Sequence, residues 1–295
     1  FTVPEELNSI IYSNQKLLYA ALYHAASATL NELSKDAKYL GADIGYICIL
    51  HTWGSAMNYH PHIHTIVLGG GLDDENKWKE TGGNFFLPYG VISKVFRGKY
   101  LDELKSLWND SKLKFHGTAE KYQNSYRFKE LLDKCYEKNW VTYCKETFNG
   151  AQSVINYLGK YTHRIAISNH RIKSMTDTTV TYVVKDYKNE GCWKEKTISG
   201  EEFIRRFMMH VPPKRFVRIR HYGLLSCRNK RKKITHCRNL LGCKKYISTL
   251  KNLNAVEMIK VLYHIDVCKC SSCGGNMVSP RKDKYSSSFH AHMRC

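Results

Sequence analysis

The sequence lacks any apolar run long enough to cross a membrane. No stretch approaches the roughly 18 apolar residues that a transmembrane helix needs, and the opening FTVPEELNSI has no basic region followed by an apolar core. We therefore expect neither a membrane partner nor a signal peptide. The chain begins at Phe1 and not at Met, which leaves open a preceding segment.

Acidic residues are also scarce. The chain has 26 Asp and Glu against 46 Lys and Arg, for a net charge of +20. Between Phe203 and Val256 there is no Asp or Glu, against fifteen Lys or Arg. Such an excess favours a polyanionic partner, nucleic acid first and an anionic membrane second, over a generally cationic surface.

Cysteine is present, but not in the pattern of a disulfide framework. The eleven cysteines are odd in number and unevenly spread. Without an export signal, they are typical of reduced thiols and zinc ligands. We expect a cytoplasmic protein, associated with the nucleoid if the source is prokaryotic. The hydrophobic content of 43% and the aromatic content of 12% indicate a folded globular chain.

Periodicity predicts a mixture of helices and short antiparallel strands. Three- and four-residue apolar spacing predicts a helix within residues 5–40, and further helices are expected at 100–115, 152–161 and 201–210. Residues 43–68 are predicted to form a hairpin around the turn HTWGSAMN. Short β-segments are predicted at 164–172, 178–187 and 193–200, and GGGL at 69–72 is predicted to be an ordinary loop.

Three histidines occupy alternate positions in NYHPHIHTIVL. On a strand, His62 and His64 share a face, about 6 to 7 Å apart, while Ile63 points into the core. The pair could simply hydrogen-bond, or it could bind one metal ion. His51, across the hairpin, is the candidate third ligand, with His60 as its competitor and Gln152 as a weaker option. Two or three protein ligands would leave open positions, as in a catalytic metal site.

Two tyrosines lie four residues apart in YLGKYTHR. Tyr157 and Tyr161 therefore share a helix face, with Cβ atoms about 6 Å apart. Such pairs most often serve packing. A tyrosine hydroxyl can also attack a phosphodiester as a nucleophile when a cation stabilises the developing charge.

The combination of these motifs resembles a known family. His-hydrophobe-His on a strand, followed about a hundred residues later by Tyr-x-x-x-Tyr on a helix, resembles the HUH endonucleases, which nick single-stranded DNA. LHTWGSAMNYHPHIHTIVLGGGL, YLGKYTHRIAISNHRI and RIRHYGLLSCRNKRKKITHCRNLLG are similar to two-tyrosine rolling-circle transposases of the insertion sequence ninety-one family. The likeness covers most of the chain.

The resemblance implies an α+β fold with the histidines on a central antiparallel sheet and the tyrosine helix packed over them. His62 and His64 match the family's metal ligands, and Tyr157 and Tyr161 match its nucleophiles. It also implies a divalent cation, Mg²⁺ or Mn²⁺, and a 5′-phosphotyrosine intermediate that conserves the bond energy for rejoining. Imidazole ligands suit manganese, zinc or nickel better than magnesium.

Basic residues after the tyrosine helix are the candidate DNA contacts. They could track the phosphates of single- or double-stranded DNA, although a solvated charged face has the same composition. The set comprises Arg164, Arg218, Arg220, Arg228, Lys230, Arg231, Lys232 and Lys233.

The cysteine-rich tail carries a candidate structural zinc site. Cys270 and Cys273 are spaced as half of a zinc knuckle and are followed by two glycines. Cys268 could substitute for either of these two cysteines. His292 and Cys295 are the candidate second half, with His290 in reserve. The alternative is a set of free cysteines in a frayed terminus.

We thus expect a catalytic domain over about 1–200, a basic DNA-binding region over 201–265 and a zinc-binding tail over 266–295. The expected function is a transposase acting on single-stranded transposon ends and target DNA. A replication initiator or relaxase, a non-catalytic zinc-containing DNA-binding protein and a hydrolytic nuclease are the alternatives.

Overall fold

The structure is a computed structural model. It describes residues 1–82, 87–144, 151–162, 165–186, 191–228, 230–243, 250, 252–270 and 272–277; of residues 151, 152, 160 and 161 it describes the backbone alone. The chain divides into two compact units, Phe1–Cys237 and Arg238–Cys295. Helices and antiparallel sheets make up the first unit, which confirms the α+β prediction.

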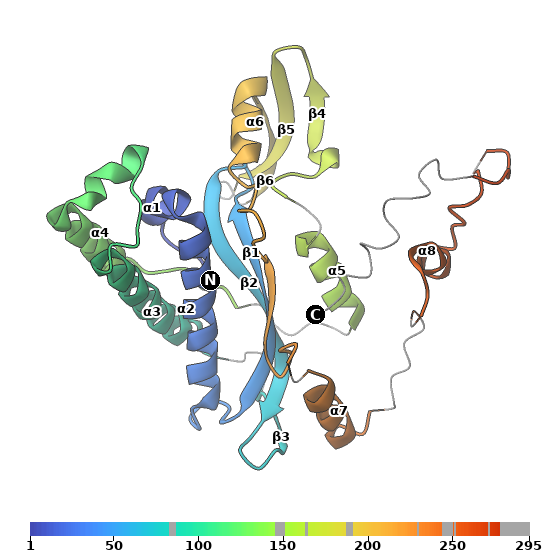
Figure 1. Ribbon diagram of the computed structural model, residues 1–295, viewed down its shortest axis with the longest axis horizontal. Coiled ribbons are helices and arrows are strands. Elements are labelled where there is room, and N and C mark those ends of the chain that lie inside the picture. Colours follow the sequence, from blue (N-terminus) through green and yellow to red (C-terminus); the bar gives the residue numbers. More distant parts are fainter. Residues whose placement is uncertain are drawn as a thin grey trace. The chain divides into compact units, whose positions relative to one another are not determined.

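A four-stranded antiparallel sheet forms the centre of the first unit, in the order β3-β2-β1-β7 (Figure 1). β1 (Asp43–Trp53) and β2 (Tyr59–Leu72) form the predicted hairpin. β3 (Trp78–Glu80) pairs with β2, and β7 (Ile219–Gly223) pairs with β1. The sheet therefore takes one strand from the region that composition marks as basic.

The helix predicted over 5–40 is three shorter elements: η1 (Glu5–Leu7), α1 (Asn8–Ser13) and α2 (Gln15–Lys35). Asn14 interrupts it because its side-chain amide donates to Lys114 O at 2.7 Å and its side-chain oxygen accepts from Lys114 N at 2.7 Å. The second predicted helix, α3 (Tyr89–Asn109), begins and ends earlier than expected. η2 (Gly117–Gln123) and α4 (Ser125–Glu137) follow.

The prediction of a loop at GGGL was wrong, because residues 69–72 belong to β2. Between the pairs Ile44–Gly71 and Tyr46–Val67 the register shifts, so β2 bulges where the glycines lie. A Cβ on Gly71 would meet the Asp43 carbonyl oxygen at 2.4 Å, and one on Gly70 would meet the Lys79 carbonyl oxygen at 2.5 Å. Gly70 and Gly71 thus permit close backbone approach within the sheet. In the sequence alone, such a run of glycines looks the same as a turn.

A smaller three-stranded sheet has the order β4-β5-β6. It comprises β4 (Ile172–Met175), β5 (Thr179–Asp186) and β6 (Cys192–Ser199). The segment predicted as β over 164–172 includes a 3₁₀ turn, η3 (Asn169–Arg171), and becomes a strand only at Ile172. The remaining helices are α5 (Ala151–Thr162), α6 (Gly200–Met208), α7 (Lys230–Leu240) and α8 (Ala255–Tyr263).

The main core lies between one face of the central sheet and helices α1 to α4 (Figure 1). Leu50 and Ile63 face each other across the hairpin and both belong to this core, each 2% exposed. The prediction that Ile63 points into the core is therefore confirmed. Among the described helices, none is both long and apolar enough to span a bilayer.

Candidate active site

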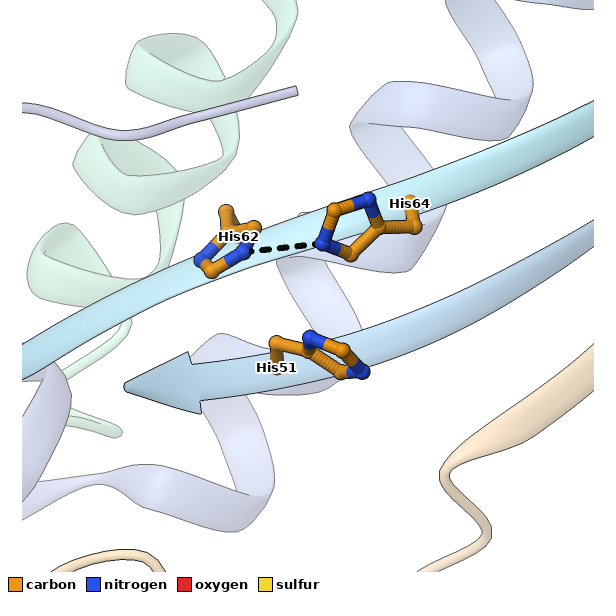
Figure 2. Close-up of side chains that lie close together, drawn as sticks. All are labelled: His51, His62 and His64. Atoms are coloured by element: carbon orange, nitrogen blue, oxygen red, sulfur yellow. Dashed lines mark hydrogen bonds between the residues drawn. The ribbon is translucent and has the colours of Figure 1, made fainter. Parts of the chain in front are cut away.

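Three histidines meet on the face of the sheet opposite Ile63. His51 lies directly across the hairpin from His62, and His64 lies across from Ile49. Since residues paired across antiparallel strands share a face, and alternate residues share it too, the register brings the three rings together. Figure 2 shows His62 and His64 on one strand and His51 on its neighbour. One nitrogen from each ring lies within 4.8 Å of the other two.

His60 is the neighbour that does not join this cluster through its ring. The hairpin register shifts between His51 and Trp53, so the extra residue of the bulge falls at His60 and Pro61. The His60 main-chain carbonyl accepts a hydrogen bond from His62 Nδ1 at 2.7 Å. The side chain of Gln152, the weaker option, lies outside the described part of the structure.

The hydrogen bonds fix which ring atoms hold protons. A carbonyl can only accept, so His62 carries its proton on Nδ1 and presents a bare Nε2. His64 Nε2 lies 3.1 Å from that atom and must donate to it (Figure 2). His64 Nδ1 is then an acceptor.

The acceptor atom of His64 faces the tyrosine helix. The Tyr157 hydroxyl lies 3.0 Å from His64 Nδ1 and donates to it. Tyr157 is half-buried in α5, so the helix lies over the histidine face. Tyr161 is one turn further along α5, but its side chain is outside the described atoms.

Burial keeps His62 and His64 neutral. It holds the pKa of His62 well below its usual value, assisted by the neighbouring His64. Burial also lowers the pKa of His64 to about 3, with a smaller effect from His51. Neutral imidazoles have the lone pairs that a metal ion requires.

The cluster fits a divalent cation. Ligand nitrogens about 2.1 Å from one ion would lie roughly 3 to 3.5 Å apart, and the His62–His64 separation of 3.1 Å is already in that range. The His60 carbonyl orients His62 from behind, as outer-shell acceptors do in metal sites. Three imidazoles suit manganese, zinc or nickel better than magnesium.

Comparisons with known proteins identify the family. A family model described as "Putative transposase" matches residues 45–233, which include the three histidines and both tyrosines. The chain belongs to this transposase family. No solved structure gives a significant match.

Two transposase relatives match most of the chain. "Putative transposase y4qJ" of Sinorhizobium fredii (strain NBRC 101917 / NGR234) is 40% identical over 243 residues, 82% of this chain and 61% of the relative. "Transposase for insertion sequence element IS801" of Pseudomonas savastanoi pv. phaseolicola is 28% identical over 280 residues, 94% of this chain and 65% of the relative. The chain thus spans less than two thirds of the length of either transposase.

The candidate DNA contacts of this transposase-family chain differ in exposure. Arg228, Lys230, Arg231 and Lys232 are exposed, at and just before the start of α7, and Lys233 is partly exposed. Arg220 lies with its guanidinium carbon 4.1 Å from the centre of the Tyr23 ring. Arg218 is half-buried and donates from Nη2 to the Thr162 carbonyl at 2.9 Å. Arg164 lies outside the described residues.

The first half of the candidate zinc site is a compact turn in the second unit. Cys270 N donates to Gly275 O at 2.8 Å, and Gly274 N donates to Cys270 O at 2.9 Å. Hydrogen bonds from the backbone N–H groups of Cys273 and Ser272 lower the pKa of the Cys270 thiol. His290, His292 and Cys295 lie outside the described residues, so the zinc site stays a prediction.

Two residues around the cluster were missed from the sequence. The Trp53 ring stacks on His51, with centroids 4.3 Å apart and planes 19° apart. His210 is buried and bonds to Thr52 Oγ1 and to Met57 O, each at 3.1 Å. Alternation along the strand could have placed Trp53 beside His51, but nothing in the local pattern points to His210.

Proposed function

We propose that this transposase-family protein nicks and rejoins single-stranded DNA at transposon ends through a 5′-phosphotyrosine intermediate. Membership of a transposase family supports action on DNA. The net charge of +20 supports a polyanionic substrate. We also propose that the protein acts in the cytoplasm, in contact with the chromosome.

One observation carries the mechanism: the Tyr157 hydroxyl lies 3.0 Å from His64, a member of the three-histidine cluster. A nucleophile and a set of metal ligands at this separation could both engage one phosphate group. A tyrosine serving only the core would not need a histidine partner on the face that the main core leaves uncovered.

The proposed cleavage conserves atoms and charge. The Tyr157 or Tyr161 oxygen attacks phosphorus, releases its proton to water, and forms a bond to the 5′ phosphate. The bond from phosphorus to the 3′ oxygen breaks, and that oxygen takes up a proton from water to become a 3′ hydroxyl. In rejoining, a 3′ hydroxyl attacks the phosphotyrosine and releases the tyrosine, so ATP is not consumed.

His51, His62 and His64 would hold the divalent cation, either Mn²⁺ or Mg²⁺. The cation would polarise the scissile phosphate and stabilise its developing negative charge. If His64 held the cation through Nε2, its proton would move to Nδ1, because a neutral imidazole has one N–H. That N–H would then donate to the Tyr157 oxygen, reversing the hydrogen bond of the metal-free site, and a hydrogen bond to the charged form favours the phenolate.

Two tyrosines on one helix face suit a reaction with two cleavages. Tyr161 follows Tyr157 by four residues, close to one helical turn. While one tyrosine holds the first phosphate, the other could cleave a second strand. We propose this division of labour without assigning an order.

The test is covalent capture of end-labelled single-stranded DNA. Wild-type protein with Mn²⁺ and transposon-end DNA should give an adduct that survives denaturation. Tyr157→Phe combined with Tyr161→Phe should abolish it, because neither phenylalanine can attack phosphorus. Tyr126→Phe is the control, since Tyr126 is an exposed tyrosine of α4 and not of α5.

The other outcomes are also informative. Cleavage without an adduct that survives the double substitution would indicate metal-dependent hydrolysis. Binding without cleavage, with every metal and end sequence tried, would indicate a DNA-binding protein and contradict the proposal. An equal response to plasmid origins and transposon ends would favour an initiator or relaxase.

A further inference from the structure

Arg218 joins the two halves of the candidate active site. It precedes β7, and its side chain is half-buried beside the end of α5. Its Nη2 donates to the carbonyl oxygen of Thr162, the last residue of that helix, at 2.9 Å. The contact spans 56 residues of sequence.

The end of a helix is a favourable place for such a contact. The last four carbonyls of an α-helix have no partner within the helix, and the C-terminus carries partial negative charge. A guanidinium there satisfies a carbonyl and interacts with the helix dipole. Arg218 therefore fixes where α5 ends relative to the sheet.

The other contacts of Arg218 lead to His51. Its guanidinium carbon lies 5.9 Å from the centre of the Trp53 ring, which stacks on His51. Its main-chain carbonyl accepts from the N–H of Leu50, the neighbour of His51, at 3.0 Å. One residue thus contacts both the helix with Tyr157 and the strand with His51.

We propose that Arg218 is a positioning residue that holds the tyrosine helix at its working distance from the histidine cluster. The inference rests on the proposed function for its kinetic consequences. It differs from the role that the sequence suggests for Arg218, a direct contact to a DNA phosphate. A displacement of the nucleophile by about 1 Å can cost 10²-fold in rate, so a cap on the helix that carries it matters for catalysis.

The rival role is specific enough to test. Arg218 Nη1 is buried without a hydrogen-bond partner among the described residues, and a phosphate oxygen could serve as its acceptor. Loss of a phosphate contact should weaken DNA binding and lower its salt dependence by about 0.7 in slope for single strands. Loss of a positioning contact should leave both unchanged.

The experiment compares three variants of the full chain. Arg218→Met keeps an apolar stem, Arg218→Lys keeps the positive charge and a donor group at one nitrogen, and Arg215→Met removes an exposed arginine from the same segment. We expect Arg218→Met to lower kcat for Mn²⁺-dependent adduct formation about 100-fold, with KM for single-stranded DNA within about twofold. Arg218→Lys should recover part of kcat, because an ammonium can still donate to the Thr162 carbonyl.

Arg215→Met, which removes the same charge from an exposed position three residues earlier, should leave kcat unchanged. If Arg218→Met instead raised KM, lowered the salt slope and preserved kcat, the phosphate role would be correct and the positioning role wrong. Thermal melting of each variant separates these effects from unfolding. If Arg218→Met does not fold, Arg218→Lys carries the same kinetic comparison.

Hydrogen exchange gives a readout that needs no activity. Amides in the last turn of α5 should exchange at least about tenfold faster in Arg218→Met than in the wild type. Unchanged exchange would overturn the inference even if the wild type formed no DNA adduct. If the wild type formed no adduct but Arg218→Met still exchanged faster, the proposed function would be contradicted. The role of Arg218 as a cap on α5 would still hold.

Discussion

The Tyr157 hydroxyl lies 3.0 Å from His64 Nδ1, although the two residues are 93 positions apart in the chain. The histidine comes from the central hairpin and the tyrosine from α5. Each motif alone has an ordinary structural explanation. Their contact gives one site with both a nucleophile and metal ligands.

Metal binding should distinguish His62 from His60. We expect His62→Ala to weaken Mn²⁺ binding by more than about 10-fold, the loss that even second-shell changes produce. His60→Ala should change it by less than about threefold, because His60 supports the site through its main-chain carbonyl. Calorimetric titration of each variant with Mn²⁺ measures this difference. If both variants lost Mn²⁺ affinity equally, the His60 ring would have to be a metal ligand.

The glycine triplet offers a matched pair for stability. Gly71→Ala would bring a Cβ within 2.4 Å of the Asp43 carbonyl oxygen, whereas Gly69→Ala would meet no atom within 4 Å. We expect Gly71→Ala to lower the free energy of unfolding by about 1 to 3 kcal/mol. Gly69→Ala should stay within about 0.5 kcal/mol of wild type. Urea denaturation tests this, and equal effects would contradict the bulged strand.

Stability without added metal should fall as pH decreases from 7 to 5. Burial lowers the pKa of His62, His64 and His210 below that of unfolded histidine, about 6.5. The unfolded chain therefore binds more protons in this range, and stability is retained above about pH 6.5 and lost below it. Each histidine contributes a slope of up to about 1.4 kcal/mol per pH unit.

His210→Gln should reduce that slope, because one titrating group is removed. Urea denaturation at pH 5, 6 and 7 provides the comparison. A free energy of unfolding independent of pH over this range would show that these histidines are accessible to protons in the folded state.

The basic residues of α7 should contribute to DNA affinity through phosphate contacts. Lys230→Ala with Lys232→Ala should reduce the salt dependence of single-stranded DNA binding by about 0.7 in slope per lost contact. The control is Lys105→Ala with Lys129→Ala, which removes the same charge from exposed positions on α3 and α4. Fluorescence anisotropy at several salt concentrations measures both slopes. If both double variants changed the salt slope equally, α7 would contribute only through the overall charge of the protein and not through specific phosphate contacts.

Much of the candidate site could be predicted because its parts obey local rules. Strand alternation places His62 and His64 on one face and Ile63 on the other, and hairpin pairing brings His51 opposite His62. The helix predicted over 152–161 carries Tyr157, and the i, i+4 spacing predicts that Tyr161 shares its face. These rules follow from backbone geometry and need no knowledge of the remaining chain.

The rest depended on tertiary contacts. Arg218 is chemically suited to a phosphate, and only the fold reveals that it caps α5. β7 adds to the sheet from within a basic stretch whose composition suggests a DNA-binding surface. The Gly69–Gly71 triplet has the composition of a loop, but Gly70 and Gly71 allow the backbones of neighbouring strands to approach closely. In each case, the same residue type occurs in two structural environments, and only the contacts in the folded chain show which one applies.

Identifying the residue to which DNA becomes attached tests the proposed phosphotyrosine intermediate most directly. Adducts formed with Mn²⁺ and single-stranded transposon-end DNA would be digested and analysed by peptide mass spectrometry. We expect a nucleotide joined through its 5′ phosphate to Tyr157 or Tyr161, with a free 3′ hydroxyl on the released strand. Cleaved DNA with a free 5′ phosphate and no modified tyrosine in the peptide containing YLGKY would contradict it.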